Sequence, residues 1–133
     1  MTTLDDHSPH FFPGFTDMYS STLTDIVDGD TIEVDIDVGF GIVLTRQRVR
    51  LYGVNTPETR TLDLEEKARG KLATKFTTDC LTGAKILLEV KGYDSFHRWL
   101  SKVYYSKSDG YILLNSQLVD EGHAVYYKVN KGP

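Results

Sequence analysis

The chain has 133 residues, a formal net charge of −4 and a sequence pI near 5.5. This length favours one domain with one core, and the acidic balance argues against a protein that coats nucleic acid tightly and without specificity. No apolar run approaches the ~20 residues of a membrane-spanning helix, so no membrane partner is expected.

The N-terminal 17 residues are expected to form a flexible tail ahead of one folded domain over residues 18–133. His7 and His10 are spaced so that they permit metal binding, but they lack partners at metal-site spacing, which favours a solvated tail. The chain shows no secretory signal, and its single Cys80 fits a reducing compartment. A cytoplasmic location is therefore expected, unless a leader has been removed.

Polar and apolar residues alternate in the first half of the chain in the pattern of β-strands. Three strands are predicted over residues 18–26, 31–38 and 42–54, with the turn signal Gly39-Phe40-Gly41 between the second and the third. Strands joined by such short connections form a meander, which must curl to bury its apolar face.

One long helix is predicted from Asp63, a plausible N-cap, to Leu81. The residues expected to face the barrel recur every four positions, with Ala73 alongside: Leu64, Ala68, Leu72, Phe76 and Cys80. Gly70 within this helix suggests a close approach to the barrel, since it costs about 1 kcal/mol of helix propensity relative to alanine.

Two further strands are predicted over residues 86–90 and 98–105, followed by a short helix over 115–121 and an extended piece over 123–129. This order predicts a mainly β, α+β fold. The predicted architecture is a five-stranded Greek-key OB-fold barrel, with the long helix between strands 3 and 4 and a short C-terminal helix.

The candidate site lies at two turns. The first is Asp28-Gly29-Asp30-Thr31, and the second follows the strand that carries Arg50 and ends at Asn55-Thr56-Pro57-Glu58. Pro57 has no N–H and ends the strand ladder. Two acidic turns beside an arginine strand indicate a place where a metal ion and a phosphate could meet.

Three segments, in this order, resemble the site segments of the staphylococcal nuclease (thermonuclease) family. They are Asp28 to Thr31, Arg50 to Glu58, and Asp94 to Arg98. The resemblance covers about Thr22 to Tyr127. That family is built on the OB-fold, so the resemblance and the strand pattern imply the same architecture.

The resemblance implies a monomeric, metal-dependent endonuclease that hydrolyses DNA and RNA, prefers single-stranded or frayed regions, and leaves 3′-phosphate ends. Arg50 and Arg98 match the arginines that clamp the phosphate, for which the planar guanidinium fork is suited. Glu58 matches the general base. Tyr126 and Tyr127 are candidates for stacking on a base.

For the cofactor, the resemblance implies one Ca²⁺, bound by Asp30 and by the backbone carbonyl of Thr56. Asn55 stands where the family usually has a second aspartate, so we expect weaker metal binding or a changed metal preference. Asp28 and Thr31 are expected to shape the turn or to bind metal-bound water.

Other readings stay open. Asn55 is also a good turn residue before Thr-Pro, Glu58 could be a solvated or loop-orienting side chain, and Arg98 could form only a surface ion pair with Asp94. At the level of function, the alternatives are a catalytically weakened OB-fold module that binds single-stranded nucleic acid, and a protein-interaction domain.

Overall fold

The computed structural model describes residues 18–127. The predicted flexible tail over residues 1–17, with His7 and His10, lies outside the described residues, as do residues 128–133. The domain boundary at residue 18 therefore stays a prediction.

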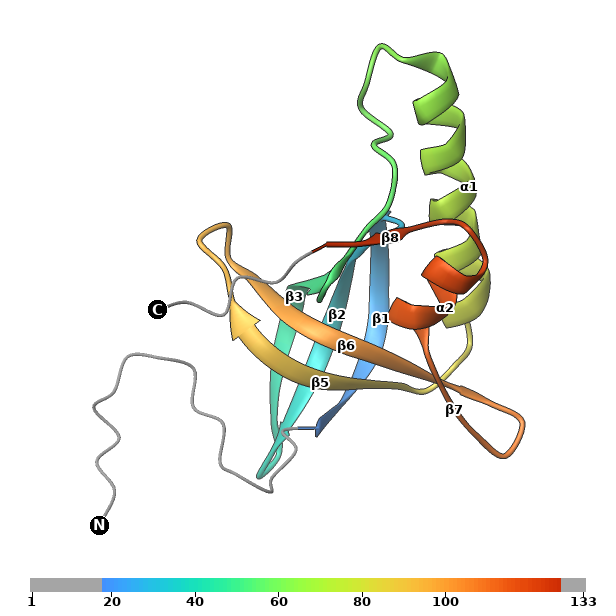
Figure 1. Ribbon diagram of the computed structural model, residues 1–133. Helices are drawn as coiled ribbons and strands as arrows, with labels where there is room; N and C mark the ends of the chain where they lie inside the picture. The colour runs from blue at the N-terminus through green and yellow to red at the C-terminus, as the bar shows by residue number, and fades with distance from the viewer. Residues whose placement is uncertain (1–17, 128–133) are drawn as a thin grey trace.

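Five long strands form a closed barrel (Figure 1). They are β1 (Met18–Asp28), β2 (Thr31–Gly39), β3 (Ile42–Leu51), β5 (Ile86–Tyr93) and β6 (Arg98–Lys107). Their order is β3-β2-β1-β5-β6, and parallel pairing of β3 with β6 closes the sheet. This confirms the predicted five-stranded OB-fold.

The remaining elements are shorter or helical. β7 (Gly110–Leu113) extends the sheet beyond β6, while β4 (Val54–Asn55) and β8 (Val125–Tyr126) form a separate two-stranded sheet. The helix α1 (Leu64–Leu81) runs along one side of the barrel, and α2 (Leu114–Asp120) lies beside its C-terminal half (Figure 1). Within residues 18–127, neither helix is both long and apolar enough to cross a bilayer.

The core fills the barrel with side chains that alternate along the strands. Ile32 and Val34 of β2, Val49 and Leu51 of β3, and Leu88 of β5 are fully buried. Since strand side chains point alternately to opposite faces, Arg48 and Arg50, which flank Val49 on β3, lie on the outer surface.

The predicted contact face of α1 was wrong in its N-terminal half. Leu64 is 78% exposed and Leu72 is 57% exposed. Ala73, which the pattern included, is buried, and the other buried residues of the helix are Gly70, Thr77 and Leu81. Small residues face inward because this part of the helix presses directly on backbone, which leaves no room for large side chains.

The N-cap prediction was right. The Asp63 carboxylate accepts hydrogen bonds from the backbone N–H groups of Glu65 (3.0 Å) and Glu66 (3.2 Å). These bonds satisfy two of the N–H groups that a helix start leaves without partners.

Asn115, at the start of α2, ties that helix to the barrel. Its amide donates to the carbonyls of Tyr52 (2.9 Å) and Ser101 (3.2 Å), and its Oδ1 accepts from the Val103 N–H (2.9 Å). The Asn115 side chain thereby fixes the turn that follows β3, next to the candidate site.

Candidate active site

The first acidic turn joins β1 to β2 and is held against α1. Thr77 donates its hydroxyl to the Gly29 carbonyl at 2.7 Å. A Cβ on Gly29 would lie 2.9 Å from the Ala73 Cβ and 3.0 Å from Thr56 Cγ2, so only glycine fits here. The helix therefore sets the position at which the turn presents Asp30.

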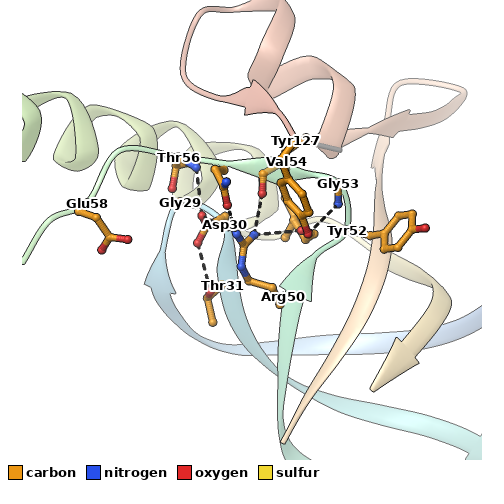
Figure 2. Close-up of polar contacts among 12 residues, drawn as sticks. Gly29, Asp30, Thr31, Arg50, Tyr52, Gly53, Val54, Thr56, Glu58 and Tyr127 are labelled. Atoms are coloured by element: carbon orange, nitrogen blue, oxygen red, sulfur yellow. Dashed lines mark hydrogen bonds and ion pairs between the residues drawn. The ribbon is translucent and has the colours of Figure 1, made fainter. Parts of the chain in front are cut away.

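Arg50 lies at the centre of the site, on the outer face of β3 (Figure 2). Its Nη1 donates to the carbonyls of Leu51 (3.0 Å), the last residue of β3, and Val54 (2.8 Å), the first residue of β4. Its Nη2 donates to Asn55 Oδ1 and lies 3.4 Å from Asp30 Oδ2. The guanidinium thus ties the second turn to the first.

The Asp30 carboxylate has further partners. Its Oδ2 accepts from the Thr56 N–H at 3.0 Å, and its Oδ1 accepts from the Thr31 hydroxyl at 3.1 Å. The side chains of Asp30 and Arg50 are only 13% and 12% exposed, so their attraction is screened less than that of a surface pair. The structure therefore brings together four of the predicted residues: Asp30, Arg50, Asn55 and Thr56.

Tyr127 packs over this cluster (Figure 2). The Arg50 Cζ lies 6.0 Å from the centre of the Tyr127 ring, and the phenol oxygen accepts from the Gly53 N–H at 3.3 Å. Tyr127 therefore helps to hold Arg50, and its role in base stacking stays a prediction. Tyr126, its neighbour on β8, is 62% exposed and has stacking surface available.

Glu58 lies on the loop between β4 and α1, apart from the Arg50 cluster (Figure 2). Its carboxylate is exposed and makes no hydrogen bond or ion pair within residues 18–127. The backbone around it is nevertheless held, because the Glu58 N–H donates to Glu66 Oε2 at 3.2 Å. In the same loop, Thr59 donates its hydroxyl to Asp28 Oδ1 at 3.0 Å. Asp28 thus joins the first turn to the loop that follows β4, and its role toward a metal-bound water stays a prediction.

Arg98 begins β6, on the strand next to Arg50. The parallel register pairs Arg48 with Arg98 and Arg50 with Leu100. All four side chains share the outer face, and the strand spacings put the Cα atoms of Arg50 and Arg98 about 8 Å apart.

The Arg98 guanidinium is paired with Asp94. Nε lies 2.9 Å and Nη2 lies 2.8 Å from Asp94 Oδ2, and the Arg98 N–H donates to Oδ1 at 2.9 Å. Burial acts to raise the pKa of Asp94, but the hydrogen bonds and charge of Arg98 outweigh it and hold this pKa below its ordinary value. The ion pair foreseen as an alternative is therefore present, and Nη1 makes no hydrogen bond or ion pair within residues 18–127.

The oxygen atoms of the cluster suit a hard cation. Asp30 Oδ2 and Asn55 Oδ1 both face the Arg50 guanidinium, so they converge on one positive centre. No group of three or more His, Cys, Asp or Glu side chains within residues 18–127 could hold a metal ion. One carboxylate with neutral oxygens fits a single ion that keeps several water ligands, rather than a tightly caged one.

Comparison with known proteins matches residues 48–132 to the model of the staphylococcal nuclease homologue family. The chain belongs to the staphylococcal nuclease family. It is 35% identical over 109 residues to the thermonucleases of Staphylococcus hyicus and Staphylococcus intermedius, an alignment that covers 79% of this chain and 59% of each relative. The chain thus spans about three-fifths of the length of these curated relatives.

Sequence reasoning missed the residues that position the site of this family member. Glu66 stands three residues after the N-cap, where a glutamate commonly bonds back to the cap N–H, but here it bonds to the Glu58 N–H. Thr77 has no sequence signal that distinguishes it from an ordinary polar helix residue, although it bonds to the Gly29 carbonyl. The one local signal was Gly70, whose cost in a helix indicated the close contact that the structure shows with the carbonyl of Pro57.

Proposed function

We propose that this chain is a metal-dependent endonuclease, with calcium as the first candidate cofactor, that hydrolyses phosphodiester bonds of DNA and RNA. The observation that carries the proposal is the convergence of Asp30, Asn55 and the Arg50 guanidinium, in a chain of the staphylococcal nuclease family. The names of the two thermonucleases support it. We expect a monomer that prefers single-stranded or frayed regions.

Asp30, Asn55 and the Thr56 carbonyl would hold the ion, which when bound supplies positive charge to a phosphate oxygen. If these oxygens held the ion, the Arg50 Nη2 would give up its bonds to Asp30 and Asn55 and could bind a phosphate. Nη1 would stay anchored to the carbonyls of Leu51 and Val54. Arg50 can therefore change partners without moving its side chain far.

Arg98 and Glu58 complete the proposed chemistry. Arg98 is oriented by Asp94 and presents Nη1 on the face that Arg50 shares, so the two guanidinium groups can stabilise the charge that gathers on a five-coordinate phosphorus. The carboxylate of Glu58, which has no partner among residues 18–127, is suited to orient a water and accept its proton. Departure of the 5′ oxygen would leave a 3′-phosphate end, as the family resemblance implies.

The test is cleavage of a fluorescent single-stranded DNA oligonucleotide in calcium, magnesium or chelator, by the parent chain and by Asn55→Asp. We expect calcium-dependent cleavage that chelator abolishes. Because Asn55→Asp adds a second carboxylate, it should lower the calcium concentration for half-maximal activity by about tenfold. Arg98→Ala and Glu58→Ala should each lower the cleavage rate by roughly two orders of magnitude or more, without unfolding the chain.

A second candidate function has an observation in its favour. Both arginines already bond to oxygen groups of the protein, Arg50 to Asp30 and Asn55, and Arg98 to Asp94. A site neutralised in this way suits a module that binds single strands without cutting them. Binding of the oligonucleotide in chelator, with no cleavage by the parent or by Asn55→Asp, would establish that function instead.

A further inference from the structure

A cleft opens beside the Arg50 cluster, with a volume of about 320 Å³. It lies between the end of β4, the first half of α1 and the turn from α2 to β8. Asn55 and Pro57 line one side, Arg69 of α1 another, and His123 and Val125 the third. This volume is at the lower end of the range, roughly 300–1,000 Å³, of pockets that take small ligands.

The cleft and the Arg50 cluster share a wall. Asn55 lines the cleft, and its Oδ1 accepts from the Arg50 Nη2. Thr56 also lines the cleft, while its N–H donates to Asp30. A phosphate bound at Arg50 would therefore be separated from the cleft by one side chain. The next nucleotide along a strand can span that separation.

The lining of the cleft is suited to a nucleotide. Arg69 is exposed, and its guanidinium makes no hydrogen bond or ion pair within the described part of the chain. Pro57 and Val125, which is 63% exposed, offer apolar surface to a sugar or a base. The one carboxylate in the lining, that of Glu66, has its Oε2 bonded to the Glu58 N–H.

We propose that this cleft binds the nucleotide next to the bond that is cut, with Arg69 on that nucleotide's outer phosphate. The inference rests on the proposed function, because it requires the strand to pass over Arg50. The cleft would add a subsite on the α1 side of Asn55, so that the affinity for a single strand grows with the length of the strand.

The test compares Arg69→Gln with Lys71→Gln. Lys71 is a matched control because it is an exposed cation on the same helix, about 200° around the axis from Arg69, and does not line the cleft. The substrates are a dinucleoside monophosphate, whose only phosphate is the one attacked, and a single-stranded hexanucleotide. Cleavage kinetics are measured in calcium, and hexanucleotide binding is measured in chelator at several salt concentrations.

Arg69→Gln should raise the KM for the hexanucleotide about tenfold, with kcat and the dinucleotide KM unchanged. It should also reduce the slope of log Kd against log salt by about 0.7, the loss of one phosphate contact to a single strand. Equal effects of Arg69→Gln and Lys71→Gln, or equal effects on both substrates, would overturn the subsite and leave the nuclease standing. Arg69-dependent binding without cleavage by the parent would keep the subsite and overturn the nuclease. Failure of the parent to bind or cut either substrate would overturn both.

Discussion

Gly70→Ala tests whether α1 positions the loop that carries Glu58. A Cβ on Gly70 would lie 2.7 Å from the Pro57 carbonyl oxygen and 2.9 Å from the Glu58 carbonyl oxygen, whereas ordinary contacts begin at 3.4 Å. The loop must therefore move by about 0.5–0.7 Å. Since a misplacement of about 1 Å can cost about a hundredfold in rate, we expect kcat to fall about tenfold.

The expected effect of Gly70→Ala on stability is small, because two terms oppose each other. Alanine gains about 1 kcal/mol of helix propensity, while overpacking costs about 1–3 kcal/mol. The control is Ala68→Gly on the exposed side of α1, which loses about 1 kcal/mol of propensity without touching the loop. Oligonucleotide cleavage and thermal unfolding are measured on both variants. Parent-like kcat in Gly70→Ala, or an equal loss in Ala68→Gly, would refute the reasoning.

Three further predictions concern the contacts around the site. Thr77→Val leaves the buried Gly29 carbonyl without its hydroxyl donor, so urea unfolding should show a loss of about 1–3 kcal/mol. Tyr127→Leu removes the ring over Arg50 and should lower kcat/KM about tenfold in cleavage assays, whereas Tyr127→Phe should lower it less. Asp94→Asn should lower the free energy of unfolding by about 1 kcal/mol at pH 7. The difference in unfolding free energy between the parent and Asp94→Asn should vanish in acid. The pKa of Asp94 is lowered by folding, so its stabilisation is present above the unfolded pKa near 3.9 and is lost as pH falls through the folded value.

Each of these predictions has a result that contradicts it. An unchanged unfolding free energy in Thr77→Val would mean that the Gly29 carbonyl finds another donor. Equal activity of the parent, Tyr127→Leu and Tyr127→Phe would show that the guanidinium is held without the ring. A difference between the parent and Asp94→Asn that persists when the pH is below the folded pKa of Asp94 would assign the effect to packing rather than to charge.

The barrel could be predicted from the sequence because its signals are local. The alternation in β2, the turn glycines and the N-cap at Asp63 each depend on a few neighbouring residues, and the order of the elements then left few folds open. Two of the three motif segments contain the residues that the structure gathers around Arg50, namely Asp30, Asn55 and Thr56. Their catalytic roles, and those of Glu58 and Arg98, stay predictions.

The sequence by itself indicated the barrel strands, the two helices and the candidate residues, because periodicity and capping act over one or two turns of chain. It wrongly joined β3 and β4 into one strand over residues 42–54, and it did not indicate β7. Only the tertiary structure decided which face of α1 is buried and which partners hold the site. Thr77 bonds to Gly29 across 48 positions, and Tyr127 bonds to Gly53 across 74. Such contacts exist only once the barrel closes and α1 docks, since they depend on distances between segments that no local pattern encodes.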